Sequence, residues 1–152
     1  MLNRDFDCLT VNGICDLTSE KKIIAGSPLT LGANGYKLAK AGDQFVGLSF
    51  NYFHTGKNDV TGGEWFADSG KLGVVKIAQV TLEADEIDGE KVYPFVYNDP
   101  FTVGAKVYVN ADGLLTVNAP ALDGYAEAEA VATVVSYDGD KGILKLFVNA
   151  QN

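Results

Sequence analysis

Side chains that serve as acid–base or nucleophilic catalysts are scarce and widely separated in this 152-residue chain. His54 is the only histidine, and none of the five serines stands in a G-x-S-x-G arrangement. A serine–histidine–acid site would depend on one imidazole beside a glycine-rich stretch, which argues against hydrolase chemistry. The phosphate-binding pattern G-x-x-x-x-G-K-[ST] is also missing, because no Lys-Ser/Thr pair follows the Gly-Ala-Asn-Gly stretch at 32–35. We therefore expect a protein that is not an enzyme.

Carboxylates gather at 83–90 and again at 138–140, and two carboxylates are enough for a glycosidase. The first group resembles a solvated turn after a strand, with adventitious calcium binding as an alternative, and neither group has the spacing of an EF-hand loop. Cys8 and Cys15 together with His54 do not complete the four ligands of a zinc site. We expect no metal and no cofactor.

The net charge of −8 is unevenly distributed along the chain. Residues 1–76 carry eight basic and eight acidic side chains, whereas residues 77–152 carry four lysines and twelve acids. Such a chain repels phosphates and anionic lipid, and no apolar run approaches the roughly 20 residues of a membrane helix. We expect no nucleic-acid or membrane partner. One interpretation of the negative charge is that it keeps the protein soluble. The other is that the molecule is polarised, with a neutral face that docks on a partner and an acidic face toward solvent.

The N-terminal sequence Met-Leu-Asn-Arg-Asp lacks the basic and apolar pattern of a secretory signal. We therefore expect synthesis in a cytoplasm, where Cys8 and Cys15 are two thiols. A disulfide across the short loop between them is the alternative in an oxidising compartment.

Turn residues recur at short intervals, and the segments between them are β-branched or aromatic. This spacing favours an all-β sandwich or barrel over βαβ units. The predicted strands are 29–31, 36–39, 45–53, 74–82, 92–97, 106–109 and 114–117.

The C-terminal part predicts a hairpin. Within Ile143–Asn149 every second residue is aliphatic: Leu144, Leu146 and Val148 point to one face, and the residues between them point to the other. This alternation is typical of a half-buried strand. The Asp-Gly-Asp-Lys-Gly stretch at 138–142 is turn chemistry. The turn joins a predicted strand at 131–137 to 143–149, and the alternation at 126–130 is predicted as strand too, with a short helix at 124–131 as the alternative because Ala and Glu favour helices.

Two segments stand outside this pattern. Residues 1–24 are predicted as an N-terminal arm with at most one short strand or helical turn, leaving 25–152 as one β domain. Residues 54–71 contain four glycines and are predicted as a long loop. Trp65 and Phe66 in this loop either plug the end of the barrel or anchor a contact with a partner.

Several segments resemble the capsid decoration proteins (cement or auxiliary head proteins) of tailed bacteriophages. They are IAGSPLTL at 24–31, GYKLAKAGDQFVGLS at 35–49, GAKVYVNADGLLT at 104–116, AVATVV at 130–135 and GILKL at 142–146. In that family a Gly-x-Pro-apolar strand is followed by a short strand, an Ala-Gly-Asp turn and a Val-Gly-apolar strand. A Val-Tyr-Val hairpin and a closing hairpin come later.

The resemblance implies a small β-barrel or β-tulip that binds the outer surface of the major capsid protein shell. It implies a homotrimer or other homo-oligomer on the virion, made in the host cytoplasm, with an arm that adds a strand to the coat protein. Phe6, Leu9 and Val11 would then be the apolar contacts of the arm. The alternative for residues 1–24 is packing on their own domain.

A second function class stays open. Numerous tyrosines together with Trp65 offer faces that stack on sugars, although tyrosine also suits half-buried strands. A carbohydrate-binding β-sandwich on a phage or cell surface is therefore the alternative to capsid decoration.

Overall fold

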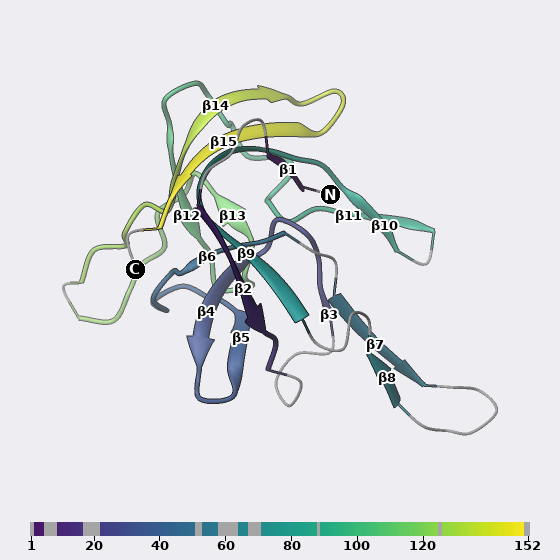
Figure 1. The fold of residues 1–152 in the computed structure, drawn as a ribbon. Coiled ribbons are helices and arrows are strands. Elements are labelled where there is room, and N and C mark those ends of the chain that lie inside the picture. The colour runs from purple at the N-terminus through teal and green to yellow at the C-terminus, as the bar shows by residue number, and fades with distance from the viewer. Residues whose placement is uncertain are drawn as a thin grey trace.

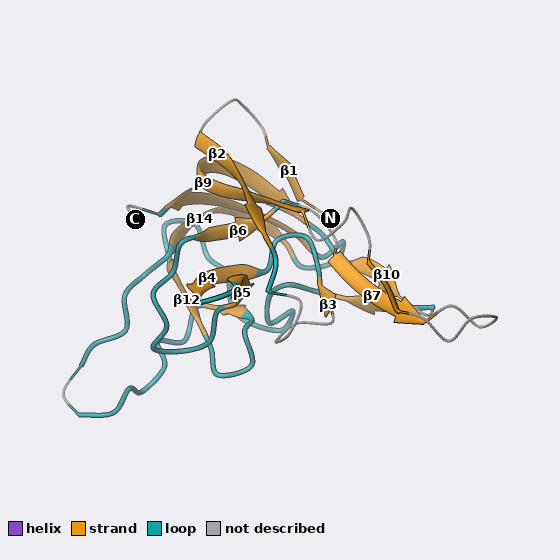
Figure 2. Ribbon diagram, turned by 60° about the horizontal axis from the view of Figure 1, so that its bottom comes forward, coloured by secondary structure: helices purple, strands orange, loops and turns teal. Residues whose placement is uncertain are grey.

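The computed structural model describes residues 2–4, 9–16, 22–50, 53–57, 64–66, 71–87, 89–124 and 126–150. These ranges contain strands and loops and no helix, so the prediction of a mainly β fold is confirmed (Figure 2). The strands are β1 (Leu2–Arg4), β2 (Leu9–Ile14), β3 (Lys22–Ile23), β4 (Pro28–Gly32), β5 (Gly35–Leu38), β6 (Gly47–Ser49), β7 (Phe53–Lys57), β8 (Glu64–Phe66), β9 (Lys71–Leu82), β10 (Asp85–Ile87), β11 (Glu90–Val92), β12 (Lys106–Val109), β13 (Leu115–Thr116), β14 (Ala132–Asp138) and β15 (Ile143–Asn149).

The main sheet is antiparallel and curls into a half-barrel (Figure 1). Its strand order is β13-β12-β14-β15-β9-β6-β4-β5, and β1 and β2 also pair with β9. Two smaller sheets, β10-β11 and β3-β7-β8, lie outside this path. In Figure 1 the β7–β8 hairpin extends away from the main sheet at the lower right.

The twelve-residue strand β9 joins the parts of this sheet. Ile77 pairs with Leu9 of β2 and with Asn149 of β15, so these two strands lie on opposite edges of β9. Val75 pairs in the same way with β2 and with Leu48 of β6. Strands β15 and β6 therefore follow one another along one edge, and β2 follows the other.

Two apolar clusters cover opposite faces of β9. Val75 belongs to a large cluster together with Leu48 and the inward side chains of β12, β14 and β15. Its neighbour Val74 points to the other face and packs with Cys15, Ile23, Leu29 and Val46. Because successive side chains of a strand point in opposite directions, two consecutive buried valines show that both faces are covered here.

Gly47 allows β6 to lie close to β9. A Cβ at this position would come within 2.7 Å of a Val74 methyl carbon and of the Val75 carbonyl oxygen. Its φ of +148° also lies in a region that side-chain-bearing residues rarely adopt. Glycine is therefore required where the β4–β5–β6 part of the sheet joins β9.

The strand predictions near 29–31, 36–39, 74–82, 106–109 and 114–117 are confirmed by β4, β5, β9, β12 and β13. The alternation over Ile143–Asn149 is confirmed as well, since Leu144, Leu146 and Val148 are fully buried. Strands β14 and β15 pair around the predicted turn at 139–142.

The prediction of at most one short strand in residues 1–24 is wrong. This segment contains β1, β2 and β3, and the first two follow one edge of β9. The physical reason is the backbone of β9, whose N–H and C=O groups on that edge need partners. A partner strand supplies these hydrogen bonds from its backbone, whatever its side chains are. The side-chain pattern of residues 1–24 therefore did not reveal the strands.

Two predicted strands differ from the structure for reasons of side-chain chemistry. The segment 92–97 ends its strand at Val92, because Pro94 has no N–H to donate, and only an isolated bridge at Phe95 follows. Residues 126–131 are a loop and β14 begins at Ala132. Alternating Ala and Glu offers no large apolar face to bury, so the alternation there did not produce a strand.

Two boundaries around residue 50 also differ. The predicted strand 45–53 is divided, since β6 ends at Ser49 and Phe53 begins β7. The long loop predicted at 54–71 contains β7 and β8, which pair as a hairpin. Glycine-rich composition therefore overestimated the irregular structure in this segment.

Neighbouring residues on β15 test the assignment of its faces. Leu146→Ala should lower the free energy of unfolding by about 2–5 kcal/mol, because the leucine is 0% exposed in the large cluster. Phe147→Ala removes a larger side chain that is 40% exposed, and it should cost less than Leu146→Ala. Denaturant unfolding of both variants measures the difference, and a reversed order would contradict the register of β15.

Candidate functional site

The residues predicted as contacts of an N-terminal arm have different surroundings. Phe6 lies outside the described residues. Leu9 belongs to β2, where its backbone pairs with Ile77 of β9. Val11 is half-buried and packs against the smaller apolar cluster. The described part of the arm thus pairs with its own sheet, which is the alternative interpretation given for residues 1–24.

Trp65 and Phe66 lie in β8, opposite Gly56 and Thr55 of β7. Their side chains lie outside the described part of the structure, as does that of His54 in β7. The backbone places both aromatic residues on the hairpin that extends from the main sheet in Figure 1.

An end of the sheet that the sequence did not single out exposes two large aliphatic side chains. Ile14 ends β2 and is 66% exposed, and Leu31 on β4 is 60% exposed. Both lie next to the start of β5. The Ile14 carbonyl oxygen would be 2.4 Å from a Cβ on Gly35, and Leu31 pairs with Tyr36. We call Ile14 and Leu31 the apolar end.

The tight contact between β2 and β5 fixes this end. The Asp16 N–H donates to the Tyr36 carbonyl oxygen at 2.8 Å, and Cys15 bridges to Tyr36 in parallel. The Tyr36 ring lies where a side chain of Gly13 would be, so glycine is needed there. Ile14 and Leu31 are thus two separate exposed aliphatic groups on strands, each available for a contact with another protein.

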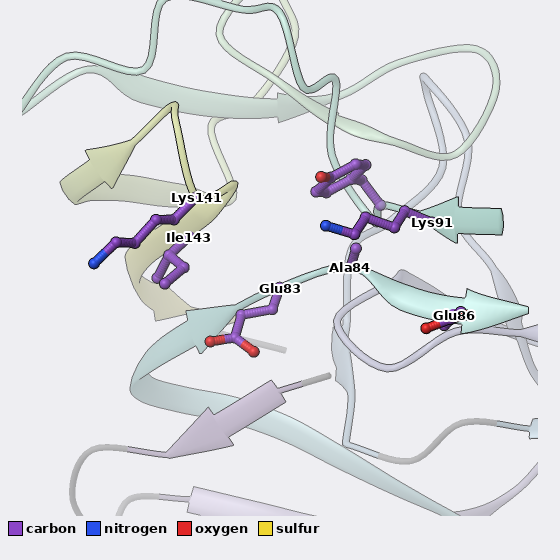
Figure 3. A pocket seen from close by; sticks show the side chains of 7 residues that line it. Glu83, Ala84, Glu86, Lys91, Lys141 and Ile143 are labelled. Carbon is purple, nitrogen blue, oxygen red and sulfur yellow. The ribbon is translucent and has the colours of Figure 1, made fainter. Parts of the chain in front are cut away.

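A pocket of about 250 Å³ lies at the opposite end of β9 (Figure 3). It is formed where the chain passes from β9 to β10, with further walls from β11 and the β14–β15 hairpin. Its lining residues are Glu83, Ala84, Glu86, Lys91, Tyr93, Lys141 and Ile143. Two carboxylates, two ammonium groups and a phenol ring therefore surround one small volume.

An aromatic cluster supports this pocket from the inside of the sheet. Phe95 is buried and its ring lies edge-on to Phe101 and Tyr137, with centroids 5.6 Å and 5.9 Å away. The Tyr93 ring lies 5.3 Å from Phe95 and 4.9 Å from Tyr97. Edge-to-face and tilted pairs of this kind hold aromatic rings in fixed orientations.

Hydrogen bonds from two phenols tie the cluster to the β14–β15 hairpin. The Tyr137 hydroxyl donates to the Tyr97 carbonyl oxygen at 2.6 Å, and the Tyr97 hydroxyl donates to the Gly139 carbonyl oxygen. Burial raises the pKa of Tyr137 above its ordinary value of 10.0, and the neighbouring Tyr97 and Tyr93 raise it further. Tyr137 therefore remains a hydrogen-bond donor throughout the neutral range.

The carboxylate of Asp99 fixes the start of the long loop that follows β13. Its Oδ2 accepts from the Thr116 hydroxyl and from the Val117 N–H, the latter at 3.1 Å. Its Oδ1 accepts from Asn118 Nδ2 at 3.3 Å. A carboxylate that accepts from three donors in one turn is a structural latch, because it ties three neighbouring residues together.

The residues that the structure describes form no metal-binding cluster and no membrane-spanning helix. No group of three or more His, Cys, Asp or Glu side chains there is arranged to hold a metal ion. The same residues form no helix long and apolar enough to cross a membrane. The Cys15 side chain is buried among apolar residues of the smaller cluster.

No protein-family model matches the chain, and no curated protein matches it significantly.

Removing the Asp99 latch should loosen the loop after β13. Asp99→Ala leaves three donors without their acceptor, so the free energy of unfolding should fall by about 1–3 kcal/mol. The Val117 amide should also exchange its hydrogen faster, which hydrogen-exchange measurements detect. Asp123→Ala in the same loop is the control, since Asp123 is exposed. Equal effects of the two substitutions would argue against the latch.

The raised pKa of Tyr137 predicts a pH effect on stability. Above pH 10.0 the folded chain holds the phenol proton more tightly than the unfolded chain, so stability falls as the pH rises past this value. Tyr137→Phe should remove a phenol that ionises above pH 10.0 from a spectrophotometric titration, whereas Tyr108→Phe outside the cluster should retain that phenol. Loss of the late-ionising phenol in the Tyr108 variant instead would contradict the assignment.

Proposed function

We propose that this protein is a capsid decoration protein that binds the outer surface of the major capsid protein shell of a tailed bacteriophage and stabilises the head. It acts there without catalysing a reaction, as a homotrimer or another homo-oligomer. Its place is the virion surface, after synthesis in the host cytoplasm.

The order of strands and turns in the segments that resemble the decoration family carries this proposal. Residues 24–31 and 35–49 contain β4, β5 and β6, joined by turns at 33–34 and 41–42. Residues 104–116 contain the hairpin of β12 and β13. These segments have the strand–turn–strand order that the resemblance implies, which supports a common fold plan.

The distribution of apolar and charged residues supports a docking role. The apolar end is built from β2, β4 and β5, which belong to the half of the sequence with no net charge. The acidic half supplies the β10–β11 hairpin and the β14–β15 turn, which lie away from the β4–β5 turn in Figure 1. A neutral, apolar end can approach a protein shell without the repulsion that the acidic half would meet from other acidic surfaces.

Binding would stabilise the head through buried surface at the junctions between coat subunits. A standard interface buries about 1,600 Å² in total, and Ile14 and Leu31 would each contribute apolar contacts to it. Repetition over the lattice multiplies a modest single affinity, so the shell resists internal pressure as a whole. Trp65 and Phe66 on the β7–β8 hairpin are proposed as a second contact.

The proposal predicts that the protein sediments together with expanded heads assembled from the major coat protein encoded beside its gene. Ile14→Glu and Leu31→Glu should each weaken this binding by about tenfold or more, because an unpaired charge in an apolar interface is costly. Both side chains are exposed, so the fold should tolerate the substitutions. Side-chain variants are cleaner than deleting residues 2–12, because β1 and β2 pair with β9.

Val103→Glu is the matched control. Val103 is 79% exposed, lies in the acidic half and gains the same charge. Its head binding should equal that of the unmodified protein. Failure of the unmodified protein to bind heads would refute capsid decoration, whereas normal binding by the Ile14 and Leu31 variants would refute only the assignment of the contact.

A further inference from the structure

We propose that the pocket between the β9–β10 connection, β11 and the β14–β15 hairpin binds one sugar ring of a saccharide. This inference is independent of capsid decoration, because it concerns the other end of β9 and a ligand rather than the coat protein. It rests on the aromatic wall of the pocket, its balance of charge and its size.

Tyr93 provides a rigid face for the apolar side of a sugar ring. Its ring is held against Phe95 and Tyr97, at centroid distances of 5.3 Å and 4.9 Å. It also lies over Gly142, where an added Cβ would come 2.8 Å from a ring carbon of Tyr93. A phenol ring fixed on two sides loses little conformational freedom when a ligand stacks on it. Ala84 and Ile143 complete the apolar lining.

The polar lining supplies donors and acceptors in equal measure. Glu83 and Glu86 are matched by Lys91 and Lys141, which are two of the four lysines in residues 77–152. The pocket is thus locally neutral in a half of the chain with a charge of −8. Figure 3 shows the Lys91 ammonium group directed toward the middle of the pocket, whereas the Lys141 ammonium group points away from it.

This balance selects the class of ligand. A phosphate or another anion is repelled by the two carboxylates, and a cation is repelled by the two ammonium groups. Like-charge repulsion therefore weakens the binding of either kind of ion. A neutral ligand with many hydroxyl groups donates to the carboxylates and accepts from the ammonium groups. Hydrogen bonds that involve a charged partner are the stronger kind.

The volume limits the ligand to a small ring. About 250 Å³ is below the roughly 300–1,000 Å³ of pockets that enclose drug-sized molecules. One hexose ring is the unit that such an open pocket accommodates, either as a free sugar or within a surface polysaccharide. We expect a dissociation constant on the order of 1–10 mM for one ring.

The test is a titration of the isotope-labelled full chain with methyl glycosides of glucose, galactose, mannose and N-acetylglucosamine, followed by amide chemical shifts. At least one glycoside should shift the amides of 83–86, 91–93 and 141–143 in a saturable way. A linear tetrasaccharide of the same sugar distinguishes the source. Equal affinity indicates a free sugar, and tighter binding of the tetrasaccharide indicates a polysaccharide.

Lys91→Met and Glu83→Gln should each weaken the affinity for the sugar by about tenfold, since each removes a hydrogen bond to a charged group. Lys106→Met on β12 is the control and should titrate like the unmodified chain. Tyr93→Leu should abolish the shifts, but Tyr93 also packs on the core, so the two surface variants decide the matter.

Absence of saturable shifts with all four glycosides and with the tetrasaccharide would overturn the proposal. Shifts that persist unchanged in both the Lys91 and Glu83 variants would overturn it as well. Head binding by the same variants should be normal, so a failed sugar titration leaves capsid decoration to be judged by its own experiment.

Discussion

The pairing of both edges of β9 is the constraint on which the rest of the structure depends. Strands β15 and β6 share one edge while β1 and β2 occupy the other, so four segments distant in sequence are aligned by one strand. A slip of β9 by one residue would exchange Val74 and Val75 between the two clusters and turn the inward face outward. Because each cluster must bury its own set of side chains, the register is fixed from two sides. Gly47 then sets how closely the β4–β6 part can approach.

The same constraint gives the molecule two ends with different chemistry. The first residues of β9 lie with β2 and β6, near the apolar end, whereas its last residues lead into the pocket. Twelve residues at about 3.3 Å each place these ends tens of ångströms apart along the strand. The neutral half of the sequence supplies the first end and the acidic half the second. The two halves are nevertheless interleaved in space, since β1 of the neutral half pairs with the last residues of β9 and the Ala41 N–H donates to the carbonyl oxygen of Asn110 in the acidic half.

Periodicity predicted those strands in which one face is buried and the other is wet. Ile143–Asn149 is such a strand, and its inward residues were identified from the alternation alone. It failed where a partner strand or a single residue decides the outcome. β2 is held by the edge of β9, and the chain near Pro94 leaves the ladder because proline lacks an N–H. The pocket was missed for a related reason. Its residues come from 83–93 and 141–143, and only the pairing of β15 with β9 brings these segments together.

The separation of the two ends also determines how their proposed activities can be tested. Substitutions more than about 10 Å apart that share no partner usually have additive effects. Charges at the two ends are further apart than the screening length of about 8 Å at physiological ionic strength. In the proposed function the apolar end gains affinity from burying Ile14 and Leu31, a contribution that ionic screening does not weaken, whereas the proposed sugar site relies on Glu83 and Lys91. If the proposed head binding uses the apolar end, the pocket at the other end of β9 stays accessible, so the proposed sugar binding does not compete with the contact to the shell.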